Sequence, residues 1–257
     1  MGSSVSIIRH MIKVASNKLT VLAKILPQPL DFIVVGEMHG SRQNAPLIQE
    51  LLLAVLTEQK PVTIAFEWLL TDLELDALRR YVYDGETPAQ LSTFFLDSDG
   101  RFTLEHIALL KWIRAYNVTH NNLIDLYAFD KPSNSGASDQ VMADSLRTYK
   151  KHHPESLILV ETGNMHARNS IDISVNTGQV PMAAILRKDY LVFSIFLHYI
   201  RGKILVEGEN RDVTKAASQQ EGPRTYFDAV IEILVSESAQ NPNDLTEILQ
   251  LLKSRPA

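Results

Sequence analysis

Two short motifs in the sequence place a glycine three residues before a histidine. Gly36-Glu37-Met38-His39 and Gly163-Asn164-Met165-His166 each follow a run of apolar residues, although the two histidines are far apart in the chain. With 11 glycines and 8 histidines in 257 residues, chance predicts fewer than one match to this pattern. The repetition indicates that both histidines belong to one functional site.

Acidic side chains occupy equivalent positions after two further apolar runs. Glu67 follows the run 62–66, and Asp130 follows the run 123–129. If these runs are parallel β-strands, their carboxyl ends meet at one edge of the sheet, where ligands bind in open α/β folds. Glycine before a polar group also lets the backbone turn sharply out of a strand. We therefore expect these side chains to converge: Glu37, His39, Glu67, Asp130 and His166.

Imidazole and carboxylate groups together support two kinds of hydrolytic chemistry. Two histidines and a carboxylate can bind Zn²⁺ or Mn²⁺ and leave a position open for water, which makes His39, Glu67 and His166 the candidate metal ligands. Without a metal, the same groups can act as general acid and base. Glu37 completes the candidate catalytic set, although it could instead cap the backbone amides that follow it. The residue types leave both mechanisms open.

Four further polar residues near the motifs are candidates for substrate binding. Asn164 could orient a substrate or only shape its turn, and Asp130 could equally initiate the turn at Lys131-Pro132. Arg42 and Arg168 lie just beyond the two motif histidines, where a guanidinium could hold an anionic substrate or an oxyanion. For both arginines, a solvated surface position is the competing interpretation.

Apolar runs that alternate with amphipathic segments predict the elements that position these groups. Buried strands are expected over 31–35, 62–66, 123–129 and 157–160. Helices are expected over 46–58, 72–83, 103–117 and 138–151. A hairpin is expected from 181–186 and 190–199, because Arg187-Lys188-Asp189 separates two apolar runs. The polar residues 207–223 predict a loop, and two helices are expected to close the chain.

Strands that alternate with helices are typical of an α/β fold. We predict three α/β/α layers around a central, mostly parallel but mixed sheet, with an antiparallel hairpin at its edge. No internal repeat and no clear linker divides the chain, so residues 31–257 are expected to form a single domain. At this length, one core can bury roughly three quarters of the surface that the unfolded chain exposes.

The first 30 residues differ from the rest of the chain in charge. They carry four basic and no acidic side chains, whereas the remaining 227 residues carry 21 basic and 30 acidic ones. Apolar residues at roughly helical spacing predict a basic amphipathic helix over 1–30, which could pack on the domain or make peripheral contact with a membrane. Met1-Gly2-Ser3-Ser4-Val5-Ser6 also fits the acceptor pattern for N-myristoylation, and an acid-free start resembles an organelle transit peptide.

The composition excludes several classes of protein and of site. The chain has no cysteine, so it has no disulfide, thiolate metal site or cysteine nucleophile. A net charge of −5 argues against nucleic acid as a partner, because a nucleic-acid surface needs a basic face. Lysines interrupt the apolar stretches near the N-terminus, so we expect neither a transmembrane span nor a cleaved signal peptide. A cytoplasmic or peripheral membrane location is the resulting expectation, and the sequence leaves the oligomeric state open.

Four segments, in order, resemble the ChaN/Tiki/TraB/erythromycin-esterase superfamily. They are Ile33-Val34-Val35-Gly36-Glu37-Met38-His39-Gly40, Ala65-Phe66-Glu67, Ser138-Asp139-Gln140-Val141-Met142-Ala143 and Val160-Glu161-Thr162-Gly163-Asn164-Met165-His166-Ala167. The segment 139–143 is most similar to the ChaN-like haem-uptake branch, and Glu37-x-His39-Gly40 is also similar to the esterase branch. The resemblance covers about residues 31–187, so the basic start and the region after residue 200 lie outside it.

The resemblance implies several activities. Tiki-type members are metal-dependent proteases, macrolide esterases activate water with the corresponding Glu and His groups, and ChaN-type members bind haem and need not be enzymes. Carried over by motif, His39, Glu67 and His166 are the implied core of the site, with Glu37 in support; no haem-ligating tyrosine can be matched. We therefore expect a hydrolase of ester, lactone or peptide bonds, acting on a small-molecule or peptide substrate. The alternatives are a haem-binding, iron-uptake protein and a degenerate member that acts at a membrane surface.

Overall fold

The computed structural model describes residues 13–15, 26–56, 60–89, 93–96, 99–130, 139–170, 180–213 and 226–254. A seven-stranded sheet with the order β1-β9-β6-β2-β5-β3-β4 forms its centre, and all strand pairs in this sheet are parallel. The strands are β1 (Lys13–Ala15), β2 (Phe32–Glu37), β3 (Val62–Phe66), β4 (Ile124–Ala128), β5 (Leu157–Gly163), β6 (Val192–Tyr199) and β9 (Ala229–Ile233). The α/β class predicted from the sequence is confirmed.

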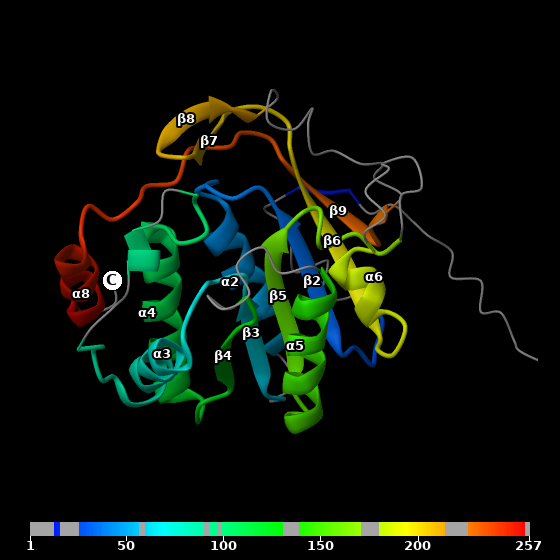
Figure 1. Ribbon diagram of the computed structural model, residues 1–257, viewed down its shortest axis with the longest axis horizontal. Helices are drawn as coiled ribbons and strands as arrows, with labels where there is room; N and C mark the ends of the chain where they lie inside the picture. Colours follow the sequence, from blue (N-terminus) through cyan, green and yellow to red (C-terminus); the bar gives the residue numbers. More distant parts are fainter. Residues whose placement is uncertain are drawn as a thin grey trace, which may run out of the picture.

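Helices cover both faces of the sheet (Figure 1), and the sheet separates two hydrophobic cores. Ile33 and Val35 of β2 pack into the core with four helices: α2 (Asn44–Val55), α3 (Asp72–Asp84), α4 (Leu104–Thr119) and α8 (Leu245–Lys253). Phe32 and Val34 pack into the other core, with α5 (Asp139–His152) and α6 (Met182–Leu186). Strands buried on both faces read as continuous apolar runs, which is why the sequence revealed most of them.

Side chains at the helix ends fix where several helices begin. The Thr71 hydroxyl accepts a hydrogen bond from the Glu74 amide at 3.3 Å, and the Glu74 carboxylate accepts one from the Thr71 amide at 2.8 Å, so α3 begins with a capping box. At the start of α4, the Thr103 amide donates to Nδ1 of His106 at 3.2 Å. This bond holds the His106 ring at the buried first turn of α4, on the side of the helix that faces the sheet.

The structure differs from the predicted elements in the hairpin, in the loop that follows it and in the helices that close the chain. Residues 182–186 form helix α6, and β6 pairs in parallel with β2 and β9, so the hairpin expected over 181–199 is wrong. An antiparallel hairpin does exist, but it joins β7 (Lys203–Val206) and β8 (Glu209–Asp212) in a separate two-stranded sheet, where part of a loop was expected. Residues 229–233 form strand β9 instead of a helix, and only α8 fits the two helices expected to close the chain.

Part of the basic leading segment is also a strand. Residues 13–15 form β1, which pairs in parallel with β9, so they do not belong to the helix expected over 1–30. Residues 1–12 and 16–25 lie outside the described residues, and so do the myristoylation-like start and most of the predicted membrane contact. No helix within the described ranges is long and apolar enough to cross a membrane.

Candidate functional site

The two glycine–histidine motifs meet at the carboxyl edge of the sheet. Strands β2 and β5 are neighbours, and their register places Glu37 opposite Gly163. A Cβ atom at Gly36 would lie 2.7 Å from the Ala167 side chain and 2.9 Å from the Asn164 backbone. Gly36 is therefore needed for the close approach of the two motifs, because a side chain there would push them apart.

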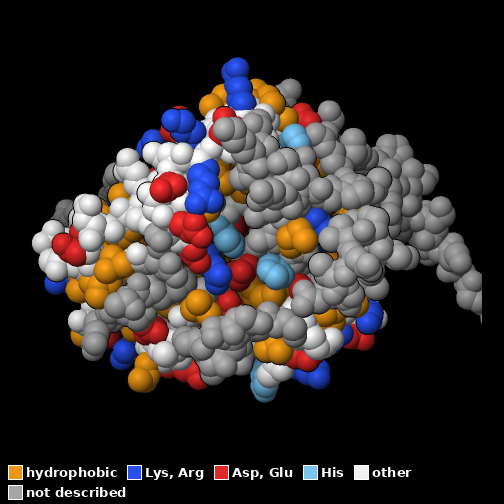
Figure 2. Space-filling view, turned by 45° about the horizontal axis from the view of Figure 1, so that its top comes forward, with side chains coloured by type: hydrophobic (Ala, Val, Ile, Leu, Met, Phe, Trp, Pro, Cys, Tyr) orange, Lys and Arg blue, Asp and Glu red, His pale blue; other side chains and the backbone are white. Residues whose placement is uncertain are grey.

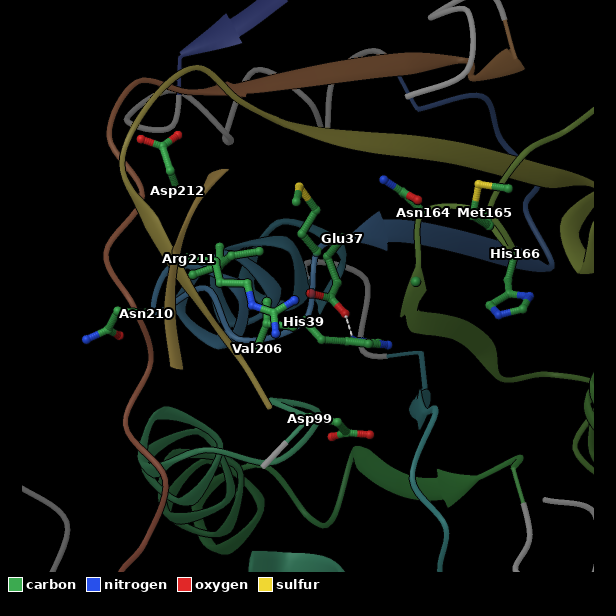
Figure 3. Close-up of a pocket in the computed structure, with 13 residues that line it drawn as sticks. Glu37, His39, Asp99, Asn164, Met165, His166, Val206, Asn210, Arg211 and Asp212 are labelled. Carbon is green, nitrogen blue, oxygen red and sulfur yellow. Dashed lines mark ion pairs between the residues drawn. The ribbon is translucent and has the colours of Figure 1, made fainter. Parts of the chain in front are cut away.

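A cavity of about 680 Å³ opens at this edge, and both motif histidines line it. Figure 2 shows a face of the molecule on which histidine side chains, in pale blue, lie close to acidic groups, in red. Figure 3 shows that the lining side chains come from both motifs and from the β7–β8 hairpin. The remaining lining residues are Met38, Asp99, Gly163, Met165, Ile204, Val206 and Asn210 to Asp212, besides Glu37, His39, Asn164 and His166.

Glu37 fixes the orientation of His39. One carboxylate oxygen of Glu37 accepts a hydrogen bond from Nδ1 of His39, and the other accepts one from the Asn44 amide. Asn44 also donates to the Met38 carbonyl at 2.9 Å, and its own oxygen accepts a bond from the Tyr199 hydroxyl. These bonds hold Glu37, which is only 3% exposed, and leave Nε2 of His39 on the side of the cavity.

Glu67 approaches His39 from strand β3. Its Oε2 accepts hydrogen bonds from the Thr162 hydroxyl at 2.6 Å and the Gly163 amide at 2.9 Å. Its Oε1 lies 3.8 Å from Nε2 of His39 and 3.9 Å from Nη1 of Arg101. One carboxylate oxygen is thus bound to the backbone of the second motif, while the other faces the histidine of the first.

Asp139 holds His166 in the way that Glu37 holds His39. Nδ1 of His166 lies 2.8 Å from Oδ1 of Asp139, and the same oxygen accepts a hydrogen bond from the Met182 amide at 2.7 Å. A Cβ atom at Gly163 would lie 3.6 Å from both Nε2 of His39 and Cδ2 of His166. The two rings therefore border the same small space, which Gly163 leaves open.

Buried carboxylates determine the charge of both histidines. Burial lowers the pKa of His39, but the charge of Glu37 and its hydrogen bond outweigh burial, so the pKa lies well above its ordinary value. For His166, burial is outweighed by the hydrogen bond that the ring donates to Asp139 and by the charge of Glu67, and its pKa is also raised. Burial alone would raise the pKa of Glu67, but the bond and charge of His39 lower it. These shifts favour the anionic form of Glu67 and the protonated forms of both imidazoles.

A second histidine–glutamate pair lies beneath the site. Nε2 of His106 is 3.4 Å from Oε1 of Glu161, and both side chains are buried. Oε2 of Glu161 has no hydrogen-bond partner among the described residues. His106 and Glu161 line a small void together with Glu37, His39 and Glu67. Burial raises the pKa of Glu37, His39 opposes this effect, and the charges of Glu161 and Glu67 reinforce it.

The four candidate substrate-binding residues lie in different surroundings. Asn164 is 2% exposed and lines the cavity, and its Nδ2 has no hydrogen-bond partner among the described residues. Asp130 lies behind the cavity, with Oδ2 3.3 Å from Nη1 of Arg101. Arg42 is exposed and lies 3.3 Å from Glu105. Arg168 is buried, with its guanidinium 5.9 Å from the Tyr226 ring centre. Of these four, Asn164 is the residue that borders the cavity.

The arrangement of the candidate metal ligands is less compact than a metal site requires. Within the described ranges, no group of three or more His, Asp or Glu side chains is placed to hold a metal ion. His39, Glu67 and His166 surround Gly163; a carboxylate binds Nδ1 of each histidine, and Thr162 and Gly163 bind one oxygen of Glu67.

Several site residues were not predicted as such from the sequence. Asn44 and Tyr199 orient Glu37, Arg101 joins Glu67 to Asp130, and the His106–Glu161 pair lies below. Asp139 was visible within the third motif segment, but there it fits an ordinary acid at the start of a helix. No sequence signal connects Tyr199 to Glu37, because the two are joined only through Asn44 in the folded chain.

Comparisons with known proteins address the fold. No protein-family model matches the chain, and a search of curated proteins finds no significant match. Among solved structures, a protein from Bacillus cereus is similar over 90% of this chain and 94% of its own, with a TM-score of 0.61 and 13% identity. A succinoglycan biosynthesis protein matches over 91% and 96%, with a TM-score of 0.63 and 12% identity.

An erythromycin esterase, EreC in its open conformation, matches over 74% of this chain and 76% of its own. The TM-score is 0.54 and the identity is 12%. At such identities the likeness concerns the fold. The chain therefore shares the fold of an erythromycin esterase, which is the fold that the resemblance of its motifs implied.

Proposed function

We propose that the protein is a hydrolase of ester, lactone or peptide bonds in which His39 and His166 act as base and acid. One observation carries the proposal: each histidine has its Nδ1 held by a carboxylate, and both rings line the same cavity. A carboxylate on Nδ1 fixes the tautomer that presents Nε2 to a substrate and stabilises the imidazolium, as in the Asp–His pair of serine hydrolases. Two such pairs at one cavity supply both proton transfers that hydrolysis requires.

His39 and Glu67 are placed to bind the attacking water. Nε2 of His39 and Oε1 of Glu67 are 3.8 Å apart, so one water molecule can form hydrogen bonds with both. The water oxygen attacks the carbonyl carbon while His39 accepts its proton at Nε2. Glu37 holds the proton on Nδ1 and offsets the positive charge of the ring. Because His39 must be neutral to accept a proton, its raised pKa means that the reactive form is populated toward alkaline pH.

Asn164 and His166 act on the other side of the carbonyl. The Nδ2 group of Asn164 is buried, unpartnered among the described residues and at the cavity wall, so it can donate to the oxyanion that forms. The raised pKa of His166 favours its protonated form, and this ring gives its proton to the leaving oxygen or nitrogen as the bond between that atom and the carbonyl carbon breaks. The products are a carboxylic acid and an alcohol or amine, and the two histidines exchange their protons with solvent afterwards.

Removal of either histidine tests this function. Purified protein is assayed against a panel of p-nitrophenyl, lactone and peptide substrates, and His39→Ala and His166→Ala are each expected to lower kcat/KM by about 10²–10⁴-fold. His152→Ala serves as the matched control, because His152 is exposed at the end of α5 and its Nδ1 bonds to the Thr148 carbonyl. Full activity in both site variants, against a substrate that the protein hydrolyses, would refute the proposal. An absorbance spectrum with added haem tests the haem-binding alternative on the same sample.

A further inference from the structure

The β7–β8 hairpin is fastened to the loop that carries His39. The Gly40 carbonyl accepts hydrogen bonds from the Leu205 amide at 3.0 Å and from the Ala239 amide at 2.8 Å. Gly40 has φ +83°, and a Cβ atom there would lie 1.9 Å from the Leu205 carbonyl oxygen. This close backbone contact gives the hairpin a defined position beside the catalytic loop, so its inward side chains belong to the site.

The strand register determines which hairpin side chains share a face. Ile204 pairs with Arg211 and Val206 pairs with Glu209, and directly opposed residues of an antiparallel pair project to the same side. Ile204, Val206 and Arg211 all line the cavity. In Figure 3 the Arg211 side chain extends from the hairpin into the cavity, toward the side where His39 lies. The inner face of the hairpin therefore combines two aliphatic side chains with one guanidinium and with the Glu209 carboxylate opposite Val206.

Arg211 is the single lysine or arginine among the described residues that line this cavity. The acidic lining group Asp99 already accepts a hydrogen bond from the Arg101 amide at 2.9 Å, and it forms an ion pair with the same residue, with Oδ2 2.8 Å from Nε. Arg211 is paired with Glu207 at 2.7 Å and lies 3.9 Å from Glu209, and these glutamates are 74% and 76% exposed. Ion pairs at such exposed positions are weak, so a carboxylate that enters the cavity can replace them.

We propose that Arg211, with Ile204 and Val206, forms a subsite for a carboxylate-bearing substrate. The substrate is an ester, lactone or amide whose carboxylate binds Arg211 and whose apolar portion packs on the two aliphatic side chains. A planar guanidinium can bind a carboxylate through two parallel hydrogen bonds, which gives geometric selectivity as well as affinity. This subsite rests on the proposed hydrolase function, because it adds a recognition group to the same cavity.

Three esters with one leaving group and equal chain length test the subsite by hydrolysis. Their acyl chains end in a carboxylate, a methyl group or a trimethylammonium group. In the unaltered protein, kcat/KM is expected to be highest for the carboxylate ester. Arg211→Gln removes one charge-assisted contact. It is therefore expected to lower the ratio of kcat/KM for the carboxylate ester to kcat/KM for the methyl ester by about 10–100-fold. Arg80→Gln, at an exposed position 4.0 Å from Glu86, is the matched control and leaves the ratio unchanged.

Two results would overturn the subsite. One is an unchanged ratio in Arg211→Gln. The other is a preference for the trimethylammonium ester, which would mean that acidic groups such as Asp212 at the cavity wall determine the selectivity.

A non-hydrolysable ether analogue of the carboxylate ester gives a readout that needs no catalysis. Calorimetry is expected to show binding to the unaltered protein and at least tenfold weaker binding to Arg211→Gln. Binding that depends on Arg211, without hydrolysis of any ester, would refute the hydrolase function and leave the subsite standing. Hydrolysis of an ester, with binding that does not depend on Arg211, would refute the subsite and leave the hydrolase function standing.

Discussion

The charge on His166 depends on two nearby carboxylates, Asp139 and Glu67. Burial lowers the pKa of this ring, and the hydrogen bond to Asp139 with the charge of Glu67 more than reverses that effect. Asp139 is itself held by the Met182 amide, so its carboxylate points at Nδ1 without needing to be reoriented. A carboxylate that keeps an imidazole protonated at neutral pH is what a general acid requires.

Asp139→Asn is expected to lower the pKa of His166 toward its ordinary value of 6.5. The sign follows because the imidazolium loses its negative partner while burial continues to disfavour the charge. Titration of the His166 ring protons by NMR measures the shift, and the alkaline limb of the pH–rate profile should move to lower pH, because His166 loses its proton sooner. Asp144→Asn, on the exposed side of the same helix, is the control. An unchanged His166 titration in Asp139→Asn would contradict this role of Asp139.

Two glycines at the sheet edge differ in the space that surrounds them, so substitutions at the two positions should have different effects on catalysis and on stability. Gly163 has no neighbour closer than 3.6 Å to the position of an added Cβ, whereas at Gly40 that position lies 1.9 Å from the Leu205 carbonyl. Gly40 also adopts φ +83°, which other residues rarely adopt. The first position tolerates a methyl group sterically, and the second does not.

Gly163→Ala should fold with a free energy of unfolding within about 1 kcal/mol of the unaltered protein. Its methyl group occupies the space between Nε2 of His39 and the His166 ring, so kcat/KM is expected to fall by about tenfold or more. Gly40→Ala is expected to cost several kcal/mol of stability, through strain at φ and the clash with the hairpin. Urea unfolding and esterase assays on both variants measure these effects. Full activity in a folded Gly163→Ala would show that the substrate does not enter this space.

Sequence patterns predicted the strands and helices that are long and periodic. The buried runs 31–35, 62–66, 123–129 and 157–160 match β2, β3, β4 and β5 within a few residues, because strands covered on both faces are mostly apolar. The apolar run 181–186 could not be assigned by periodicity, since five residues fit a helical turn as well as a strand. Strand β8 is fully polar, so only its pairing with β7 reveals it.

The site was predictable to the extent that its residues follow strands. Glu37, Glu67 and the two glycine–histidine motifs were visible because apolar runs end just before them. Asn44 and Tyr199 were not, because they act by contacts formed after folding, and the Asn44–Tyr199 bond joins residues 155 positions apart. Arg211 was hidden for a similar reason: its role depends on the register of a hairpin in which neither the strand nor the partner was expected.

In the molecule as a whole, the cavity and most of the core that contains α8 lie in different places. The residues that line the cavity at the carboxyl edge of the sheet come from several segments between positions 37 and 212. Helix α8 closes the core on one face, where it packs against α4, and Figure 1 shows it at the margin of the molecule. Because the cavity is bordered by the strand ends and the hairpin, stability and catalysis should be separable by substitutions in α8.

Ile248→Ala tests this separation. Ile248 is fully buried in the core that contains α2, α3 and α4, so removal of its side chain should cost about 2–5 kcal/mol in the free energy of unfolding. Below the unfolding transition, kcat/KM should stay within about twofold, because no cavity-lining residue belongs to α8. Thr246→Ala is the control on the exposed face of the same helix and should change stability by less than about 0.5 kcal/mol. Urea unfolding followed by circular dichroism, with activity measured in the same solutions, provides both quantities. A large loss of kcat/KM in folded Ile248→Ala would mean that α8 and the catalytic edge are coupled through the sheet, because the substitution touches no group that meets the substrate.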